Sequence, residues 1–203
     1  MLEMTLKKLG RKFYERRVVD VAKDLLGKLL IRRVSGQTLM GRIVEVEAYR
    51  GSDDPASHAY RGKTERNKIM FDKGGLAYIY LAYGIHRLLN VTAEPPGKPA
   101  AVLIRALEPI KGVEVMMKFR ETSDLRALTN GPGRLTEALS IGLELNGLDL
   151  TASDELFIAD DGFRGFEIAS SSRIGVRDKR RWRFYIKGNR FVSKEAFMLN
   201  DSC

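Results

Sequence analysis

The chain has 203 residues, of which 44% are hydrophobic and 30% are charged, and this composition excludes a disordered or low-complexity protein. Its 35 lysines and arginines exceed its 26 aspartates and glutamates, so the net charge of +9 favours a polyanionic partner, either nucleic acid or an anionic membrane surface. The charged N-terminal segment is unlike a secretory signal and no apolar run is long enough to cross a bilayer, so we expect an intracellular protein, cytoplasmic in a prokaryote and nuclear in a eukaryote.

The first predicted elements are a helix and a β-hairpin. Residues 18–26 have helical spacing of apolar residues that ends at Gly27, and a strand follows from about residue 28 to residue 34. The turn-forming sequence SGQT separates this strand from a second one over residues 39–49. Residues 50–75 show no clean periodicity and are rich in turn formers, which predicts a long ordered loop of the kind that usually carries function.

A second hairpin is predicted within the sequence GLAYIYLAYGIHRLLNVT, residues 75–92. Tyr78 and Tyr80 alternate with small or aliphatic residues, so both rings project from one face of a strand. Tyr83 lies beside Gly84, where the run turns back on itself. The pattern therefore places an aromatic ring at the tip of the hairpin.

The remainder of the chain mixes strands and helices. A strand over residues 100–107 is expected to stop at Glu108-Pro109, and helices are expected over residues 112–121 and, after Gly131-Pro132-Gly133, over residues 133–142. Further strands are expected at residues 155–159, 166–170 and 183–188. No repeat or linker divides the chain, so residues 1–203 are predicted to form a single α+β domain with a mainly antiparallel sheet.

The strand sequence RIVEVEAY carries two closely spaced carboxylates. Strict alternation puts Arg42, Val44, Val46 and Ala48 on one face and Ile43, Glu45, Glu47 and Tyr49 on the other. Two carboxylates beside an apolar residue and an aromatic ring suit a pocket better than a plain solvent face. The alternative is an exposed strand face that forms surface salt bridges.

His58, one of two histidines, lies in the long loop among basic residues. A loop histidine is either a catalytic group or a structural hydrogen-bonding group. No metal-binding motif accompanies it, and Cys203 is the only cysteine, which excludes an intramolecular disulfide and a thiolate cluster. The pairs Asp53-Asp54 and Asp160-Asp161 have the spacing of turns and are assigned to them.

Asn90 and Arg105 interrupt otherwise apolar strands. A buried amide or guanidinium needs polar partners, so each side chain is expected to face a polar cavity or a carboxylate, and the alternative for Arg105 is a structural pair with a glutamate. The chain has neither a phosphate-binding P-loop nor a dinucleotide-binding glycine motif, which argues against nucleoside-triphosphate and dinucleotide enzymes.

Residues 173–190, RIGVRDKRRWRFYIKGNR, contain eight lysines and arginines against one aspartate, with Trp182, Phe184 and Tyr185 between them. Interleaved basic and aromatic residues are typical of nucleic-acid-binding surfaces. The alternative is that the aromatic residues belong to the core of a strand. Together with the pocket residues and the tyrosine at the hairpin tip, this segment suits an enzyme that flips a base out of a duplex.

At this point the sequence closely resembles a known family, the alkyladenine (3-methyladenine) DNA glycosylases of the mammalian type. The resemblance extends over nearly the whole chain and is carried by ordered motifs, among them VAKDLLGKLL, GRIVEVEAYRGSDDPASHA, GKTERNKIMF, YIYLAYGIHRLLNVT, VLIRALEP, NGPGRLTEAL and RIGV followed by WRFYIKG. It implies a single domain with a curved antiparallel sheet, whose hairpin enters the DNA minor groove. It also implies a monomer that excises damaged purines of the 3-methyladenine, hypoxanthine and ethenoadenine class from double-stranded DNA, without metal or cofactor.

The resemblance assigns the chemistry to two residues. Glu47 is implied as the general base that deprotonates a water, which attacks the anomeric carbon of the deoxyribose. Arg105 is implied to position Glu47 and this water, with the backbone near Ile174 closing the water site. No lysine matches a Schiff-base nucleophile in the motif, so the expected product is an abasic site without strand cleavage.

The resemblance also implies how the base is held. Tyr49 is expected to stack on one side of the flipped base, and His58 with Tyr80 on the other. Asn90 is expected to line the pocket and exclude purines whose exocyclic amino group it cannot accommodate. Tyr83 is expected to fill the gap that the flipped base leaves in the duplex.

The segment RDKRR, residues 177–181, is shorter and more basic than in some relatives, so phosphate contacts there are expected to differ. Two other functions stay open on the sequence alone. One is a nucleic-acid-binding module without catalysis, which leaves Glu47 without a role. The other is a hydrolase or modifying enzyme that acts on RNA or on free nucleosides.

Overall fold

The computed structural model describes residues 6–51 and 53–193, and Cys203 lies outside them. Within this part of the chain, nine strands form one sheet and every pairing between them is antiparallel. The strands are β1 (Lys7–Lys8), β2 (Leu29–Val34), β3 (Gln37–Arg50), β4 (Ala77–Ala82), β5 (His86–Ala93), β6 (Ala100–Lys111), β7 (Leu156–Asp160), β8 (Ile168–Ser171) and β9 (Arg183–Ile186). The predicted α+β class with a mainly antiparallel sheet is confirmed.

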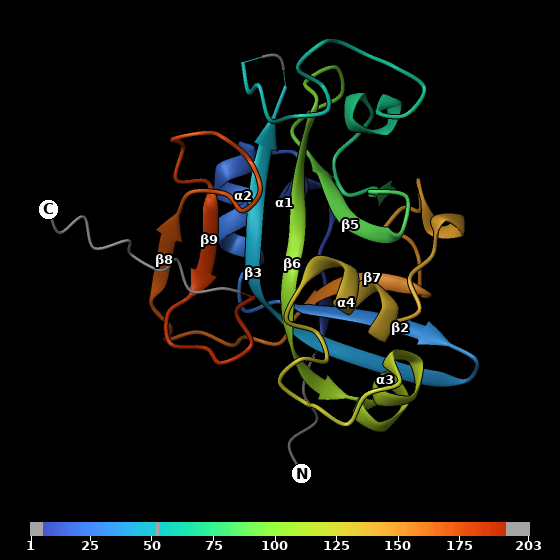
Figure 1. Cartoon of the computed structure of the whole chain (residues 1–203). Helices are drawn as coiled ribbons and strands as arrows, with labels where there is room; N and C mark the ends of the chain where they lie inside the picture. The colour runs from blue at the N-terminus through green and yellow to red at the C-terminus, as the bar shows by residue number, and fades with distance from the viewer. Residues whose placement is uncertain (1–5, 52, 194–203) are drawn as a thin grey trace, which may run out of the picture.

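The strand order is β1-β7-β2-β3-β6-β5-β4, with β9 pairing to both β3 and β8. In Figure 1, β3 and β6 run side by side through the middle of the molecule, with β8 and β9 on one flank and β5 on the other. β3 is long enough to pair with β2 along its first half and with β9 along its second half. The strand that pairs with β3 on this side therefore changes from β2 to β9 next to the carboxylates.

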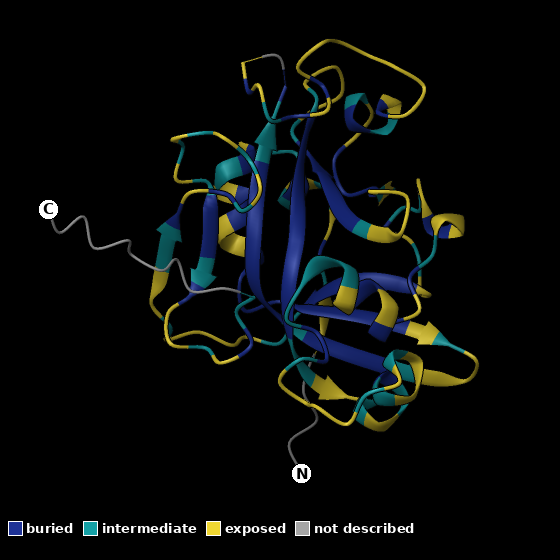
Figure 2. Cartoon of the chain, in the orientation of Figure 1, coloured by how far each residue is buried: buried dark blue, intermediate teal, exposed yellow. Residues whose placement is uncertain are grey.

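Four α-helices and two short 3-10 helices complete the described fold. They are α1 (Arg11–Tyr14), α2 (Val18–Leu25), α3 (Val113–Arg120), α4 (Pro132–Ala138), η1 (Lys68–Phe71) and η2 (Leu143–Leu145). α2 buries Val18, Val21 and Leu25 in the main core and ends at Leu25, just before the predicted stop at Gly27, whose φ of +81° favours glycine. Figure 2 shows that β3, β5 and β6 are mostly buried, whereas exposed residues lie in loops, on helices and at strand ends.

The pairing of β3 with β6 is irregular next to the carboxylates. Ile43 pairs with Leu107, Glu45 with Ala106 and Val46 with Ile104, so Val44 and Arg105 have no partner in this register. The predicted placement of Ile43 with the carboxylates was wrong, because Ile43 is fully buried in the same core as Val44 and Val46. Irregular pairing bends a strand and re-aims side chains, so a strict alternation of faces does not hold through it.

The strand predicted to stop at Glu108-Pro109 instead continues to Lys111. Pro109 lies opposite Gly41 beside a register shift, where a ladder hydrogen bond is already interrupted and a missing N–H is tolerated. α4 begins at Pro132 itself rather than after Gly133, because proline is well suited to the first position of a helix. The short elements β1 and α1 were not predicted. No described helix is long and apolar enough to span a membrane.

Candidate active site

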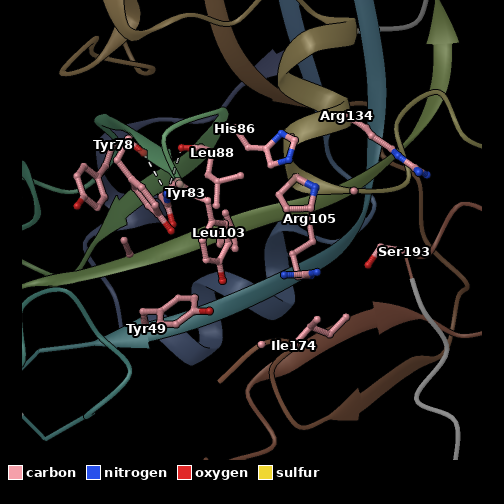
Figure 3. Close-up of a pocket in the computed structure, with 18 of the residues that line it drawn as sticks. Tyr49, Tyr78, Tyr83, His86, Leu88, Leu103, Arg105, Arg134, Ile174 and Ser193 are labelled. Atoms are coloured by element: carbon pink, nitrogen blue, oxygen red, sulfur yellow. Dashed lines mark hydrogen bonds between the residues drawn. The ribbon is translucent and has the colours of Figure 1, made fainter. Parts of the chain in front are cut away.

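A cavity of about 830 Å³ opens where β3, β4, β5 and β6 meet the long loop, α4 and residues 174–176. Six of the seven predicted site residues line it, namely Tyr49, His58, Tyr80, Tyr83, Asn90 and Arg105. Figure 3 shows Arg105 near the middle of the cavity, with Tyr49 and Ile174 on one side of it and His86 and Arg134 on the other. The structure thus brings together residues that are spread widely along the sequence.

One row of residues across four strands forms part of the floor. Glu47 on β3 pairs with Leu103 on β6, Leu103 pairs with Asn90 on β5, and Asn90 pairs with Tyr78 on β4. Residues directly opposite each other in a sheet project from the same face. The row therefore carries a carboxylate at one end and an aromatic ring at the other, with an amide between them.

Glu47 is the seventh predicted residue, and it is fully buried. The Tyr49 hydroxyl donates to Glu47 Oε2 at 2.7 Å, the Ile174 main-chain N–H donates to Oε1 at 2.7 Å, and Arg105 Nη1 lies 3.4 Å from Oε2. All three of these partner residues line the cavity. An ionised carboxylate only accepts hydrogen bonds, so this set of donors matches the charged form that a general base needs.

Arg105 also contacts a second buried carboxylate. Its Nε donates to Glu45 Oε1 at 3.0 Å, and Glu45 is fully buried. Glu45 additionally accepts hydrogen bonds from Arg183 and from Ser193. The sequence analysis placed Glu45 on the pocket face but gave it no role. Two glutamates spaced two apart on one strand, beside a strand that carries an arginine, are a usable signal for such a buried ion pair.

Three aromatic rings, those of His58, Tyr78 and Tyr80, form one wall of the cavity. The His58 and Tyr80 rings lie 4.5 Å apart between centroids, and Tyr78 and Tyr80 lie 5.5 Å apart. His58 Nδ1 and the Tyr78 hydroxyl form a hydrogen bond of 2.7 Å. Burial, and then the nearby Arg66 guanidinium, hold the pKa of His58 below its ordinary 6.5, and burial raises the pKa of Tyr78 to about 12. Both groups are therefore neutral at pH 7.

Asn90 is buried between β4 and β6, in agreement with its predicted place in the pocket. Its amide Nδ2 donates to the main-chain oxygen of Tyr78 at 3.1 Å and to that of Leu88 at 3.4 Å. These bonds satisfy the buried donor and fix the side chain relative to the aromatic wall.

Tyr83 lies at the tip of the β4–β5 hairpin, as the sequence predicts. Ala82 pairs with His86, and Tyr83 between them has a φ of +52° and is 92% exposed. A bulky residue in the left-handed region is uncommon and is typical of a functional constraint. Ile85, which sequence reasoning did not single out, is 69% exposed on the same tip.

The basic segment at residues 173–190 faces partly inward. Arg173 and Arg183 are buried, and Arg173 bonds both oxygens of Asp54 at 2.7 Å. Asp54 makes turn contacts to Arg50 and Ala56, as its assignment predicts, and it also neutralises a buried arginine, which the spacing did not show.

Two of the three aromatic residues of this segment bear out the alternative interpretation, because Phe184 lies in the core and Trp182 packs against it. In the short loop at residues 177–181, Arg177 and Lys179 are exposed, whereas Arg180 pairs with Asp54 and Asp178. The described residues contain no group of three or more His, Cys, Asp or Glu side chains that could hold a metal ion.

Comparison with known proteins identifies relatives along most of the chain. A family model described as "Methylpurine-DNA glycosylase (MPG)" matches residues 12–190. A protein of Alkaliphilus oremlandii is 46% identical over 202 residues, which cover 93% of this chain and all of the relative. A protein of Methanocella arvoryzae is 47% identical over 194 residues, which cover 93% of this chain and 96% of the relative. Both relatives carry the name "Putative 3-methyladenine DNA glycosylase".

Proposed function

We propose that this chain, which belongs to the methylpurine-DNA glycosylase family, flips alkylated or deaminated purines out of duplex DNA and hydrolyses their N-glycosidic bond with a water activated by Glu47. Membership of the family makes it a DNA glycosylase of base-excision repair. The observation that carries the mechanism is the buried Glu47 carboxylate, which three cavity-lining residues surround with hydrogen-bond donors.

In the proposed reaction Glu47 accepts a proton from a water molecule, and the water oxygen bonds to the anomeric carbon of the deoxyribose. The glycosidic bond breaks, and its electron pair leaves with the purine. The transition state has oxocarbenium character, so the negative charge of Glu47 close to the sugar also stabilises it. Arg105 Nη1 lies 3.4 Å from Glu47 Oε2, and Arg105 is proposed to hold both the carboxylate and the water. This arrangement resembles that of glycosidases that activate water with a carboxylate.

The base is proposed to lie between the rings of Tyr49 on one side and of His58 and Tyr80 on the other. Neutral aromatic faces favour a base that carries positive charge, which an alkylated purine does before it leaves. Asn90 lies below this space on the cross-strand row and is proposed to exclude purines that carry an additional exocyclic amino group. These roles rest on the positions of the side chains around the cavity.

The exposed ring of Tyr83 is proposed to enter the minor groove and to fill the space of the flipped nucleotide. An inserted apolar wedge offsets part of the energy of unstacking. No lysine lines the cavity among the described residues, which supports simple hydrolysis to an abasic site rather than Schiff-base chemistry. We propose that the enzyme acts as a monomer on double-stranded DNA.

The test is single-turnover release of base from a duplex oligonucleotide with one hypoxanthine or ethenoadenine, and from methylated DNA, in the presence of a chelator. The wild type is compared with Glu47→Gln and with the control Glu167→Gln, which changes an exposed carboxylate paired with Lys187. We expect release by wild type and control, and a rate reduced by about 10² or more in Glu47→Gln with DNA binding retained.

Release by Glu47→Gln at the wild-type rate would remove the proposed mechanism. Competition with single-stranded RNA at fixed salt separates a DNA enzyme from one that acts on RNA. Tight duplex binding by a wild type that releases none of these bases would favour a binding module without catalysis.

A further inference from the structure

Glu45 lies beside the proposed general base but does not line the cavity. It is fully buried and accepts four hydrogen bonds, from Arg105 Nε at 3.0 Å, Arg183 Nε at 2.7 Å, Ser193 N at 2.6 Å and Ser193 Oγ at 2.9 Å. We infer that Glu45 is a positioning residue, which aims the Arg105 guanidinium at Glu47 and thereby sets the geometry of the reaction. This inference rests on the proposed role of Glu47.

The first argument comes from the backbone. Arg105 has no partner in the register between β3 and β6, because Ala106 pairs with Glu45 and Ile104 pairs with Val46. Regular pairing therefore does not dictate where the Arg105 side chain points, since residues at such irregularities are re-aimed. The contact with Glu45 is the interaction that sets its direction.

The second argument comes from the shape of the guanidinium group. Arginine carries its donors in a rigid planar fork, so fixing one nitrogen fixes the positions of the others. Glu45 holds Nε, and Nη1 then lies 3.4 Å from Glu47 Oε2. Arg105 also lines the cavity in which a water would have to be held.

The third argument concerns charge. Glu45, Glu47, Arg105 and Arg183 form a buried group of two carboxylates and two guanidiniums, with side chains between 0% and 10% exposed. A buried charge is stable only when it is paired. Because Glu45 pairs with both arginines, Arg105 is not drawn fully onto Glu47, whose carboxylate remains available to a water molecule.

Glu45 also links the proposed reaction site to Ser193. Ser193 gives Glu45 two hydrogen bonds and itself lines the cavity. The same carboxylate therefore fixes one wall of the cavity and the cation inside it. Both effects act through neighbouring groups, so Glu45 is a positioning residue and not a catalytic one.

The experiment is a double-mutant cycle on the full chain, with single-turnover base release from lesion-containing duplex as the readout. The four proteins are wild type, Glu45→Gln, Arg105→Gln and the double variant. We expect Glu45→Gln to slow release by about tenfold or more, since small displacements of a reacting group have effects of this size. In the Arg105→Gln background we expect the same change to alter the rate by less than about twofold, because the coupled partner is absent.

A purely structural role predicts another pattern, in which the two losses multiply. A second readout is the Kd for a duplex with an abasic-site analogue, which is expected to stay within about twofold of wild type in Glu45→Gln, because the change affects the reaction and not DNA binding. The matched control is Asp161→Asn, which breaks another ion pair of low exposure. Its partner is Arg42, which lies on β3 as Glu45 does, and neither Asp161 nor Arg42 lines the cavity. This control is expected to lower stability and to leave the rate of release unchanged.

If Glu45→Gln does not fold, Glu45→Asp takes its place in the cycle. Aspartate keeps the negative charge between Arg105 and Arg183, but its shorter side chain cannot hold both guanidiniums where Glu45 holds them. Wild-type rates in the folded Glu45 variant, or losses that multiply, would overturn the inference while leaving the role of Glu47 in place. Absence of release by the wild type would overturn the proposed function and the inference together.

Discussion

The main-chain N–H of Ile174 donates a hydrogen bond of 2.7 Å to Glu47 Oε1, although the two residues are 127 positions apart in the sequence. The preceding residue, Arg173, holds this segment in place. Its guanidinium donates to the main-chain oxygen of Ala48 at 2.9 Å and to both oxygens of Asp54. The Arg173 side chain also lies over the Tyr49 ring, 4.5 Å from its centroid. A buried ion pair thus supports both the proposed general base and one of the aromatic faces.

Asp54→Asn is expected to lower the free energy of unfolding by about 3 kcal/mol, because it leaves the buried Arg173 charge with Asp178 as its remaining carboxylate. It is also expected to slow base release, since the Ile174 segment loses its anchor. Urea denaturation measures the first effect. The control is Asp20→Asn, which changes an exposed carboxylate 3.9 Å from Arg17. A loss below about 1 kcal/mol in Asp54→Asn would show that the pair is not the anchor.

Tyr83→Asn separates stability from function at the hairpin tip. Asparagine adopts the left-handed conformation more readily than tyrosine, so the φ of +52° becomes less costly and thermal stability is expected to be equal or higher. Base release from a paired duplex is expected to slow about tenfold, because the wedge that offsets unstacking is removed. A lesion in a single strand needs no unstacking of a pair and is the control substrate. Equal losses on both substrates would argue against the wedge.

The sequence predicted where the tyrosines of the second hairpin lie, because local pattern determines where they point. Tyr78 and Tyr80 alternate along a regular strand, and Tyr83 next to Gly84 marks a turn, so their faces follow from spacing alone. The position of Ile43 did not follow from spacing. It depends on the irregular register between β3 and β6, in which Val44 and Arg105 have no partner, and β6 lies far from β3 in the sequence.

The ion-pair partners of the buried charged residues also could not be predicted from local sequence. Asp54 appeared to be a turn residue, and Arg173 and Arg183 appeared to belong to a basic surface. Their pairing with distant groups is decided by the tertiary fold, which places Asp54 against Arg173 and Glu45 against Arg183. Spacing along the chain carries no information about such contacts.

Arg134, on the rim of the cavity, is expected to contact a phosphate of bound DNA. Its Nη1 donates to the neutral side chain of Asn130 at 2.6 Å, so its charge remains available. Arg134→Gln is expected to weaken binding to any duplex and to make the negative slope of log K against log salt shallower by about one. The control is Arg164→Gln, because Arg164 is paired with Asp160 and is not part of the cavity. Equal slopes for wild type and Arg134→Gln, measured by fluorescence anisotropy, would exclude the phosphate contact.

His58 is expected to make stability depend on pH below neutrality. Burial holds its pKa below 6.5 in the folded state, so the unfolded chain takes up a proton more readily than the folded chain does. The stabilisation that goes with a neutral His58 is complete at pH values above 6.5, and it is lost as pH falls from 6.5 toward the lower folded pKa. Protonation would also set a cation against the face of a positively charged alkylated purine.

The measurement is the free energy of unfolding in urea for wild type and His58→Gln, at about pH 7.5 and about pH 5.5, on either side of the ordinary histidine pKa. Glutamine keeps a polar group near the Tyr78 hydroxyl but does not titrate. Other acid-sensitive groups are shared by the two proteins, so the difference between them reports His58. We expect the stability advantage of the wild type to be larger at the higher pH and to narrow at the lower one. An advantage that stays constant on acidification would mean that folding does not shift the pKa of His58, which would contradict the effect of burial. An advantage that grows would mean that folding favours protonated His58, which would be incompatible with its proposed stacking on a cationic base.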